Sequence, residues 1–324
     1  MKNLFLKIYR LVRRPVNRLL NKIDPPVVVL LYHRVATLPS DSEMLAVTPD
    51  NFRAQLKFLR KNFPLVRFEE DWTTLPKQAV AVTFDDGYAD NAMEALPIME
   101  EEKVPATFFV STGTIDTTRE FWWNEVERIV LEGRHLPASF TMKAGRFKKK
   151  WPTGSETERR SFYQELVRYL TNADSGQRDD LLLQLRGWAR SEQGVATRNR
   201  AMTVDELRRL AESSWATIGA HTVTHTRLSS LPARLQLHEI ADSKRQLETW
   251  IGREITVFSY PFGKRGDYTK ETVALCREAG FAKAATNVPG QAHIWTDPHR
   301  IPRLLVRNWP VETFARRLEE FWTK

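Results

Sequence analysis

The feature that most constrains this chain of 324 residues is an alternation of short apolar runs with amphipathic helical segments. Residues 27–32 and 79–84 are apolar almost throughout but too short for helices, which is typical of strands buried on both faces. Helical periodicity follows over 48–63 and 91–102. Further strands are expected at 105–111, 215–220, 255–260, 281–285 and 304–306, and further helices from Thr203, at 233–251, at 270–279 and from Val311 onward. Such repetition predicts a parallel sheet and favours a closed (β/α) barrel, with an open doubly wound sheet as the alternative.

The alternation stops between residues 114 and 200. This stretch contains Trp122 and Trp123, a basic run over 143–150 and helical periodicity over 160–190. We predict an inserted, mostly helical subdomain in which the basic run is a solvated loop. The two tryptophans are expected in its core, with stacking on sugar rings as the weaker alternative. The predicted organisation is an N-terminal segment at 1–24, a barrel from 25–113 and 201–324, and the insertion at 114–200.

The positive charge is concentrated at the N-terminus. The formal net charge is +9, and residues 1–23 contribute seven basic residues and no acidic one. The rest of the chain is nearly balanced, which argues against a nucleic-acid partner. Apolar residues at near-helical spacing predict a short basic amphipathic helix that contacts an anionic membrane surface; a basic tail, or a helix packed on the domain, is the alternative. No secretory signal or membrane-spanning run is recognisable, so we expect a cytoplasmic protein, peripheral at the inner membrane surface in one version of this hypothesis.

Two adjacent carboxylates, Asp85 and Asp86, follow the apolar run 79–84 in the motif Thr-Phe-Asp-Asp-Gly. Adjacent carboxylates at the end of a buried strand are costly unless they are paired or bind a cation. Because neighbouring side chains on a strand point to opposite sides, one can bind a metal while the other faces a water molecule. The alternative is ordinary turn chemistry, in which both aspartates form a turn and cap the next helix.

A histidine pair, His221 and His225, follows the predicted strand 215–220. Imidazole nitrogens suit zinc and its neighbours, and a carboxylate would complete a three-ligand catalytic site. Such a pair alone is weak evidence, because most are ordinary polar residues. Together with the aspartates the signal is stronger, since both motifs follow strands and barrel enzymes place catalytic groups at the carboxyl ends of their strands. The one cysteine, Cys276, excludes a cysteine-based zinc site.

Two further motifs follow predicted strands. In residues 258–263, Pro261 and Gly263 impose an irregular backbone whose free N–H groups are able to face a developing oxyanion. A tight exit from the strand is the alternative. His33 follows the first strand and is a candidate proton donor, while a structural hydrogen bond is an equally weighted alternative.

The motifs Thr-Phe-Asp-Asp-Gly, His-Thr-x-x-His and Tyr-Pro-Phe-Gly, in this order, resemble the NodB-type polysaccharide deacetylases (carbohydrate esterase family four). The resemblance covers residues 26–113 and 203–306 and implies a distorted (β/α) barrel with a divalent metal, usually zinc. It implies that Asp85 is the base that deprotonates water and that the backbone N–H of Phe262 helps to bind the oxyanion. The implied metal ligands are Asp86, His221 and His225, and the expected substrate contacts are Tyr260, Pro261 and Arg303.

Departures from the family pattern leave the proton donor open. Ser259 stands where many members have an arginine that braces the base, and the late Leu-x-His motif that supplies the general acid is missing. The sequence is more similar to the exopolysaccharide branch, whose members act on poly-N-acetylglucosamine or surface glycans. We rank His33 first as proton donor, with His293 and His299 behind it. Arg303 is also a candidate to brace Asp85.

The resemblance implies a metal-dependent hydrolase that removes N-acetyl groups from N-acetylhexosamine units of a surface glycan or a lipid-linked precursor and releases acetate. One rival is a sugar O-acetyl esterase on the same scaffold. Another is a glycan-binding relative with little activity, which the missing arginine and Leu-x-His motif favour slightly and the intact Asp-Asp and His-His motifs oppose.

Overall fold

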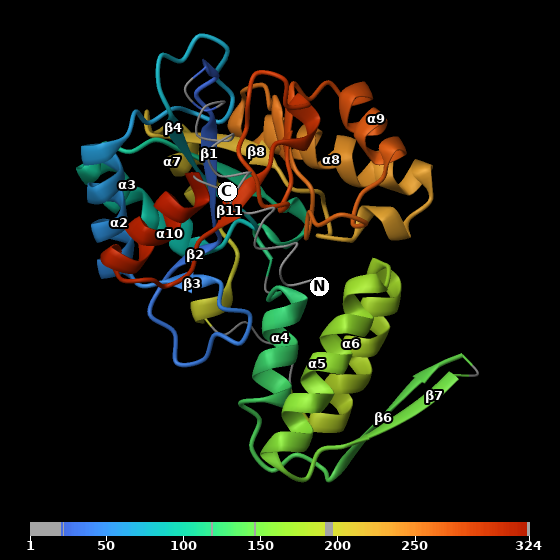
Figure 1. Cartoon of the computed structure of the whole chain (residues 1–324). Coiled ribbons are helices and arrows are strands. Elements are labelled where there is room, and N and C mark those ends of the chain that lie inside the picture. Colours follow the sequence, from blue (N-terminus) through green and yellow to red (C-terminus); the bar gives the residue numbers. More distant parts are fainter. Residues whose placement is uncertain (1–20, 22, 118, 146, 192–196, 323–324) are drawn as a thin grey trace, which may run out of the picture.

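The computed structural model describes residues 21, 23–117, 119–145, 147–191 and 197–322 (Figure 1). The predicted basic N-terminal segment, residues 1–24, therefore lies almost entirely outside the described residues. Among the helices of the described residues, none is both long enough and apolar enough to span a membrane.

A nearly closed barrel of seven parallel strands forms the body of the described chain (Figure 1). Its two edges approach each other where Ala285 pairs with Ile301 and the Thr286 N–H donates to the Ile301 carbonyl over 2.8 Å. The predicted barrel is confirmed, and the alternative of an open doubly wound sheet is wrong. In spatial order the strands are β10 (Lys283–Ala285), β9 (Val257–Ser259), β8 (Ala216–Ala220), β5 (Ala106–Val110), β4 (Ala79–Phe84), β1 (Val27–Tyr32) and β11 (Arg303–Leu305).

The central strands are apolar because they bury both faces. All six residues of β1 and all six of β4 are buried. Alternate residues form two separate clusters: Val27, Val29, Ala79 and Ala81 pack in the barrel interior with Phe109, while Val28, Leu30, Val80 and Val82 pack against the surrounding helices. Residue 85 continues the interior-facing set of β4, so its side chain emerges at the carboxyl end of the barrel.

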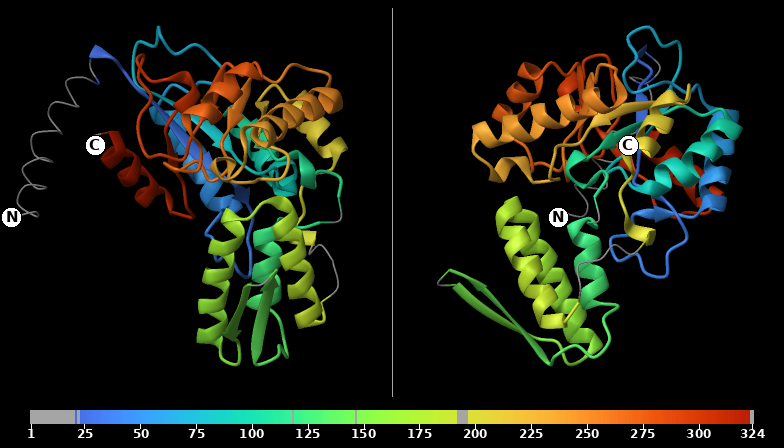
Figure 2. Two further views of the ribbon diagram at one scale, coloured as in Figure 1. Left: turned by 90° about the vertical axis from the view of Figure 1, so that its right-hand side faces the viewer. Right: turned by 180° about the vertical axis from the view of Figure 1, so that it is seen from behind.

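Helices cover the outside of the barrel (Figures 1 and 2). The predicted capping box is present, because Thr203 accepts from the Glu206 N–H and the Glu206 carboxylate accepts from the Thr203 N–H. Gly252 ends α8 with φ +66°, as expected for a helix C-cap. The helices are α2 (Pro49–Asn62), η1 (Asn91–Ala95, a π-helix), α3 (Leu96–Glu102), α7 (Val204–Glu212), α8 (Ala233–Ile251), α9 (Lys270–Glu278) and α10 (Val311–Trp322), with short turns η2 (Thr112–Thr114), η3 (Thr197–Asn199), η4 (Leu228–Ser230) and η5 (Pro298–Arg300). A small parallel pair, β2 (Arg34–Val35) and β3 (Ala46–Val47), lies beside the barrel.

The insertion forms a separate layer next to the carboxyl ends of the barrel strands (Figures 1 and 2). Its elements are α4 (Trp122–Val130), β6 (Ser139–Ala144), β7 (Phe147–Pro152), α5 (Glu156–Asn172) and α6 (Ser175–Ala189). Phe140 and Trp151 of the two strands stack on each other and pack against Phe162 of α5. These aromatic side chains are continuous with the buried cluster on the outside of the barrel. The insertion covers the end of the barrel where the catalytic motifs were expected.

One prediction about the insertion is wrong. The basic run over 143–150 is not a loop but most of an antiparallel hairpin formed by β6 and β7. Phe140 and Met142 on β6 and Trp151 on β7 are buried against the helices, while the lysines occupy the exposed positions. The period of two in 139–144 was the available signal for this hairpin.

Candidate metal centre and active site

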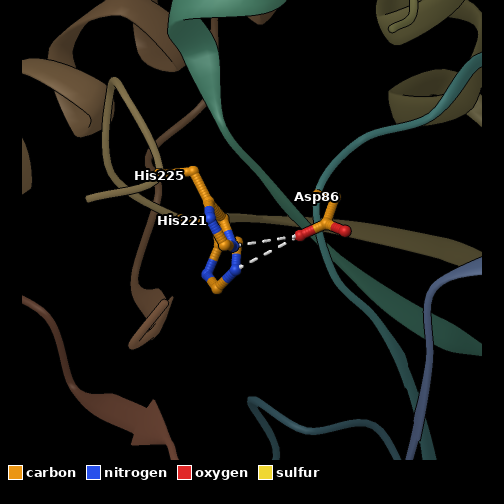
Figure 3. Close-up of side chains that lie close together, drawn as sticks. All are labelled: Asp86, His221 and His225. Carbon is orange, nitrogen blue, oxygen red and sulfur yellow. Dashed lines mark ion pairs between the residues drawn. The ribbon is translucent and has the colours of Figure 1, made fainter. Parts of the chain in front are cut away.

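The residues predicted to bind a metal lie together at the carboxyl end of the barrel (Figure 3). Asp86 follows β4, and His221 and His225 follow β8. The Oδ1 atom of Asp86 is 3.6 Å from Nε2 of His221 and 3.3 Å from Nε2 of His225. All three residues are buried. The structure therefore brings together one carboxylate and two imidazoles from distant parts of the chain.

The protonation of this cluster suits a divalent cation. Burial lowers the pKa of His221 to about 4 and that of His225 to about 3, so both imidazoles are neutral at physiological pH. Nδ1 of His221 lies 2.7 Å from the Ser259 carbonyl, to which it donates, and Nε2 is left as the free ligand atom. Burial raises the pKa of Asp86. Nδ1 of His225 is buried without a hydrogen-bond partner among the described residues. This donor set fits zinc or a similar ion.

The cluster rests on strained backbone. Asp86, His225 and Phe262 have φ values of +80°, +50° and +60°, a left-handed region that is unfavourable for residues with a side chain. Gly87 follows with φ +93°, and a Cβ atom there would lie 2.9 Å from a methyl group of Val110. Non-glycine residues in this region cost about 1–3 kcal/mol each and persist where the surrounding structure holds them. The strain is concentrated where the ligands are positioned.

Asp85 is held as an ionised carboxylate by Arg303. Its two oxygens accept hydrogen bonds of 2.7 Å from the two terminal nitrogens of Arg303, and its Oδ2 accepts a third, of 3.2 Å, from the Ser259 hydroxyl. Burial alone would raise the pKa of Asp85, but the charge and the hydrogen bonds of Arg303 outweigh it and hold that pKa well below its ordinary value. Arg303 also donates from Nε to the Thr286 carbonyl. The bracing arginine therefore comes from β11, and Ser259 adds its hydroxyl to the same network.

Removing Arg303 is expected to destabilise the fold. In Arg303→Met the Asp85 carboxylate stays buried without its partner, which costs about 3–5 kcal/mol of unfolding free energy. Arg303→Lys should lose less stability because it keeps the positive charge, although it does not keep the bidentate geometry. The pair requires ionised Asp85, whose pKa is lower in the folded state than in the unfolded state. The stability that the pair contributes is therefore full above the unfolded pKa of about 4 and is lost as the pH falls from there toward the folded pKa. The gap between wild type and Arg303→Met should narrow at acidic pH, as urea unfolding at several pH values would measure. Arg300→Met is the control, because Arg300 is a half-exposed neighbour. Equal free energies of unfolding for Arg300→Met and Arg303→Met at neutral pH would contradict the stabilising role of Arg303.

The loop that carries His225, residues 222–226, is held by two charged side chains, Glu239 and Arg178. We call it the ligand loop. The carboxylate of Glu239 on α8 accepts from the N–H groups of Val223 and Thr224 over 2.9 and 2.8 Å. Arg178, a buried residue of α6 in the insertion, donates to the carbonyls of Thr224 and His225 over 3.1 and 3.2 Å. The insertion thus contributes a buried charge that positions His225.

We expect Arg178→Met to weaken metal binding about 10–100-fold, the usual effect of removing a partner that orients a ligand. The two loop carbonyls would lose their donor, and the left-handed His225 would lose part of its support. Competition with a chromogenic chelator would measure the affinity. Arg168→Met on α5 of the same insertion is the matched control, because Arg168 makes none of these contacts with the ligand loop. Equal affinities for the two variants would show that Arg178 has no such role.

A cavity of about 370 Å³ opens onto the cluster. The insertion contributes Trp122 and Trp123, which are buried as predicted but also form part of the cavity wall. The rings of Trp123 and Phe262 both contact the ring of His225, with centroids 4.7 and 4.9 Å from its own. The cavity is lined by His33, Glu43, Leu45, Asp85, Asp86, Trp122, Trp123, Val167, Thr171, His221, His225, Phe262, Lys264, Asp267, Asn287, Leu305 and Arg307.

Several predicted site residues lie outside the cavity lining. The Tyr260 hydroxyl donates to the His299 carbonyl over 3.1 Å and its ring stacks on Tyr268, so its side chain packs in the core; Pro261 is also absent from the lining. The substrate contacts predicted for these two residues and for Arg303 are therefore not supported by their positions.

The three histidines ranked as proton donors are also separated by the structure. His33 lines the cavity, and burial lowers its pKa against the opposing charges of Asp86 and Asp85. Nε2 of His299 lies 2.8 Å from the Phe281 carbonyl, and Nδ1 of His293 lies 3.0 Å from the Asp24 carboxylate. These two residues have structural partners away from the cavity, so His33 alone of the three remains as a candidate.

Sequence reasoning missed Arg178 and Glu239 altogether. Both lie on helices whose sequences carry no catalytic motif, and their role depends on which loop they contact. The position of Trp122 and Trp123 in the cavity wall had a weak signal, because they begin the first helix of an insertion that follows the carboxyl end of β5.

Solved structures with the same fold come from several bacteria. IcaB from Ammonifex degensii superposes with a TM-score of 0.59 at 19% identity, covering 92% of this chain and 97% of IcaB. BA0330 from Bacillus anthracis, described as a polysaccharide deacetylase, superposes with a TM-score of 0.59 at 19% identity, covering 90% of this chain and 69% of that structure. At this identity the two comparisons show a shared fold.

The sequence also matches a family. YxkH of Bacillus subtilis strain 168, named as a polysaccharide deacetylase, is 20% identical over 271 residues, which are 82% of this chain. This chain spans 65% of the length of YxkH. Residues 73–174 and 190–284, more than half of the chain, match the polysaccharide deacetylase family model. The chain therefore belongs to the polysaccharide deacetylase family.

Proposed function

We propose that this protein is a metal-dependent deacetylase that hydrolyses N-acetyl groups on N-acetylhexosamine units of a poly- or oligosaccharide and releases acetate. The observation that supports it best is the arrangement of Asp85. An ionised carboxylate, braced by Arg303, lies in one cavity with three buried side chains that form a metal-ligand set. Membership of the family supports deacetylation as the reaction.

Different residues of the chain have different roles in the proposed reaction. A divalent metal held by Asp86, His221 and His225 would supply a Lewis acid that polarises the acetyl carbonyl and lowers the pKa of water. Asp85, kept ionised by Arg303, takes the proton of the attacking water. The Phe262 N–H donates no hydrogen bond to another described residue. It is therefore available to bind the oxyanion of the tetrahedral intermediate.

The departing amine needs a proton, and we assign its delivery to His33. Its imidazole lines the same cavity as Asp85. Its lowered pKa makes the resting imidazole neutral and makes its protonated form a ready donor. Asp85 is the source of the proton, since it has just received one from water. The aromatic walls formed by Trp122 and Trp123 suit the apolar face of a sugar ring.

An acetate-release assay tests this proposal. The substrates are N-acetylglucosamine oligomers of increasing length, lipid-linked N-acetylhexosamine and O-acetylated xylan, each with and without a chelator. We expect release from the N-acetylated substrates that stops with chelator and returns on addition of zinc. Release from O-acetylated xylan alone would instead establish an esterase, and release that is insensitive to chelator would overturn the role of the metal.

A further inference from the structure

A second hollow, of about 430 Å³, lies in the insertion, and we call it the insertion groove. It is formed between the hairpin of β6 and β7 and the helices α5 and α6, which lie beside the hairpin in Figure 1. None of the residues assigned above to the metal or to the reaction lines it. On its two main walls β7 contributes Lys149 and Trp151, and α5 contributes Glu165, Arg168, Tyr169 and Asn172.

The lining combines aromatic rings with fixed polar groups. Trp151 donates from Nε1 to Oε2 of Glu165 over 2.9 Å, and Lys149 donates to the same oxygen over 2.6 Å. These bonds hold the Trp151 ring in the wall of the groove. Tyr169 is 36% exposed, and Gln177 in the first turn of α6 adds an amide. Aromatic rings with a few placed polar groups are typical of a ligand site, and a sugar ring offers an apolar face to such rings and hydroxyls to such groups.

The charges of the insertion groove nearly cancel. Of its lining residues, Lys149 and Arg168 are basic and Glu165 is acidic, and Lys149 pairs with Glu165 over 2.6 Å. An anionic polymer would meet the Glu165 carboxylate, and a cationic polymer would meet the two basic groups. Neither polymer finds a surface of one opposite charge, which is what attracts such ligands. A neutral ligand rich in hydroxyl and acetamido groups suits this lining better.

The insertion groove and the catalytic cavity share helix α5. Val167 and Thr171 of this helix line the cavity. Arg168 and Asn172, each the next residue along the helix, line the groove. A helix with its side chains is about 10–12 Å across, so one extended ligand can reach both hollows. A chain of several sugar units can therefore occupy both, whereas a single sugar cannot.

Polar contacts connect the two hollows. Oδ1 of Asn172 accepts a hydrogen bond from the guanidinium of Arg227. Nε of Arg227 lies 3.0 Å from Oδ1 of Asp267, which lines the catalytic cavity. The border between the hollows is thus polar and continuous from the insertion to the barrel. We propose that the insertion groove binds further sugar units of the N-acetylated glycan whose reacting unit occupies the cavity; the identity of that glycan rests on the proposed function.

The dependence of acetate release on chain length tests this inference with the zinc-loaded full chain. The substrates are N-acetylglucosamine, its dimer and longer oligomers up to the hexamer. We expect kcat/KM of wild type to rise about tenfold from the dimer to the hexamer as the groove is filled. Tyr169→Ala should lose most of this rise and keep wild-type kcat/KM on the dimer, because the dimer does not reach the groove. Tyr169→Phe keeps the ring and should keep the rise.

The matched control is Leu183→Ser, which replaces a 65% exposed residue of α6 outside the groove. It should show the same dependence on chain length as wild type. Far-ultraviolet circular dichroism and zinc content of all variants should match wild type, because the replaced side chains are exposed and lie outside the cavity.

Direct binding separates this inference from the proposed function. Isothermal titration of the N-acetylglucosamine hexamer into zinc-loaded Asp85→Asn measures affinity in a variant expected to lack turnover, and adding Tyr169→Ala should weaken that affinity about tenfold. Equal hexamer affinities, no hexamer binding, or acetate release with the same length dependence in wild type and Tyr169→Ala would overturn the groove and leave the deacetylase intact. No acetate release from any oligomer, with a hexamer affinity that depends on Tyr169, would overturn the proposed function and leave the groove.

Discussion

Asp85→Asn is expected to lower kcat by about 10³-fold, because general-base catalysis contributes roughly 10²–10⁴-fold. The amide has nearly the shape of the carboxylate and can still accept from Arg303, but it has no basic oxygen that takes a proton from water. Asp86 and the two histidines are unchanged, so the variant should retain wild-type metal content. Acetate release under saturating substrate, with elemental analysis of the same sample, separates the two effects.

A stability measurement must accompany this variant, because Asp85→Asn leaves the buried Arg303 without its counter-charge. Circular dichroism at the assay temperature shows whether the loss of turnover occurs in folded protein. Asp71→Asn is the control, since Asp71 is an exposed aspartate near the opposite end of the barrel. A kcat within tenfold of wild type in Asp85→Asn would show that another group is the base.

His221→Ala is expected to abolish metal binding, and not only to lower the rate of the reaction. Loss of an orienting partner alone typically costs 10–100-fold in metal affinity, so loss of a direct ligand should exceed about 100-fold. His221 also joins two parts of the site, because its Nδ1 donates to Ser259 while its Nε2 lies beside Asp86. Zinc content after dialysis, measured by elemental analysis, should fall to background.

His238→Ala is the matched control for metal loss. His238 lies on α8, where its side chain is largely exposed and pairs with Asp242 instead of the ligand loop. It should keep full zinc content. Full zinc content in His221→Ala as well would mean that the cluster of Asp86, His221 and His225 does not hold the metal.

The elements of the barrel were predictable from local patterns. Runs such as 27–32 and 79–84 are apolar because both faces are covered, and this property is visible in the sequence without knowledge of the neighbours. The position of Asp86 and His221 just after strands predicted that they share one end of the barrel, which is a consequence of parallel topology. Their close approach could therefore be expected, although not its distances.

The insertion was predicted less well. Its hairpin was missed because charged residues at the exposed positions, such as Lys148 and Lys150, obscured the period of two. Its contact with the ligand loop had no sequence signal, since Arg178 in α6 resembles any other arginine of an amphipathic helix. Only the packing of α6 against the barrel end made that side chain a support for His225.

The sequence by itself determined the alternation of strands and helices, the residue types of the metal cluster and the end of the barrel at which they gather. Tertiary structure decided which side chains share the site: Arg303 reaches Asp85 across 218 residues, and Tyr260 points into the core rather than the cavity. The reason is physical. Periodicity and ligand chemistry are properties of short segments, whereas a contact between distant residues exists only once barrel closure and strand register have placed them within hydrogen-bonding distance.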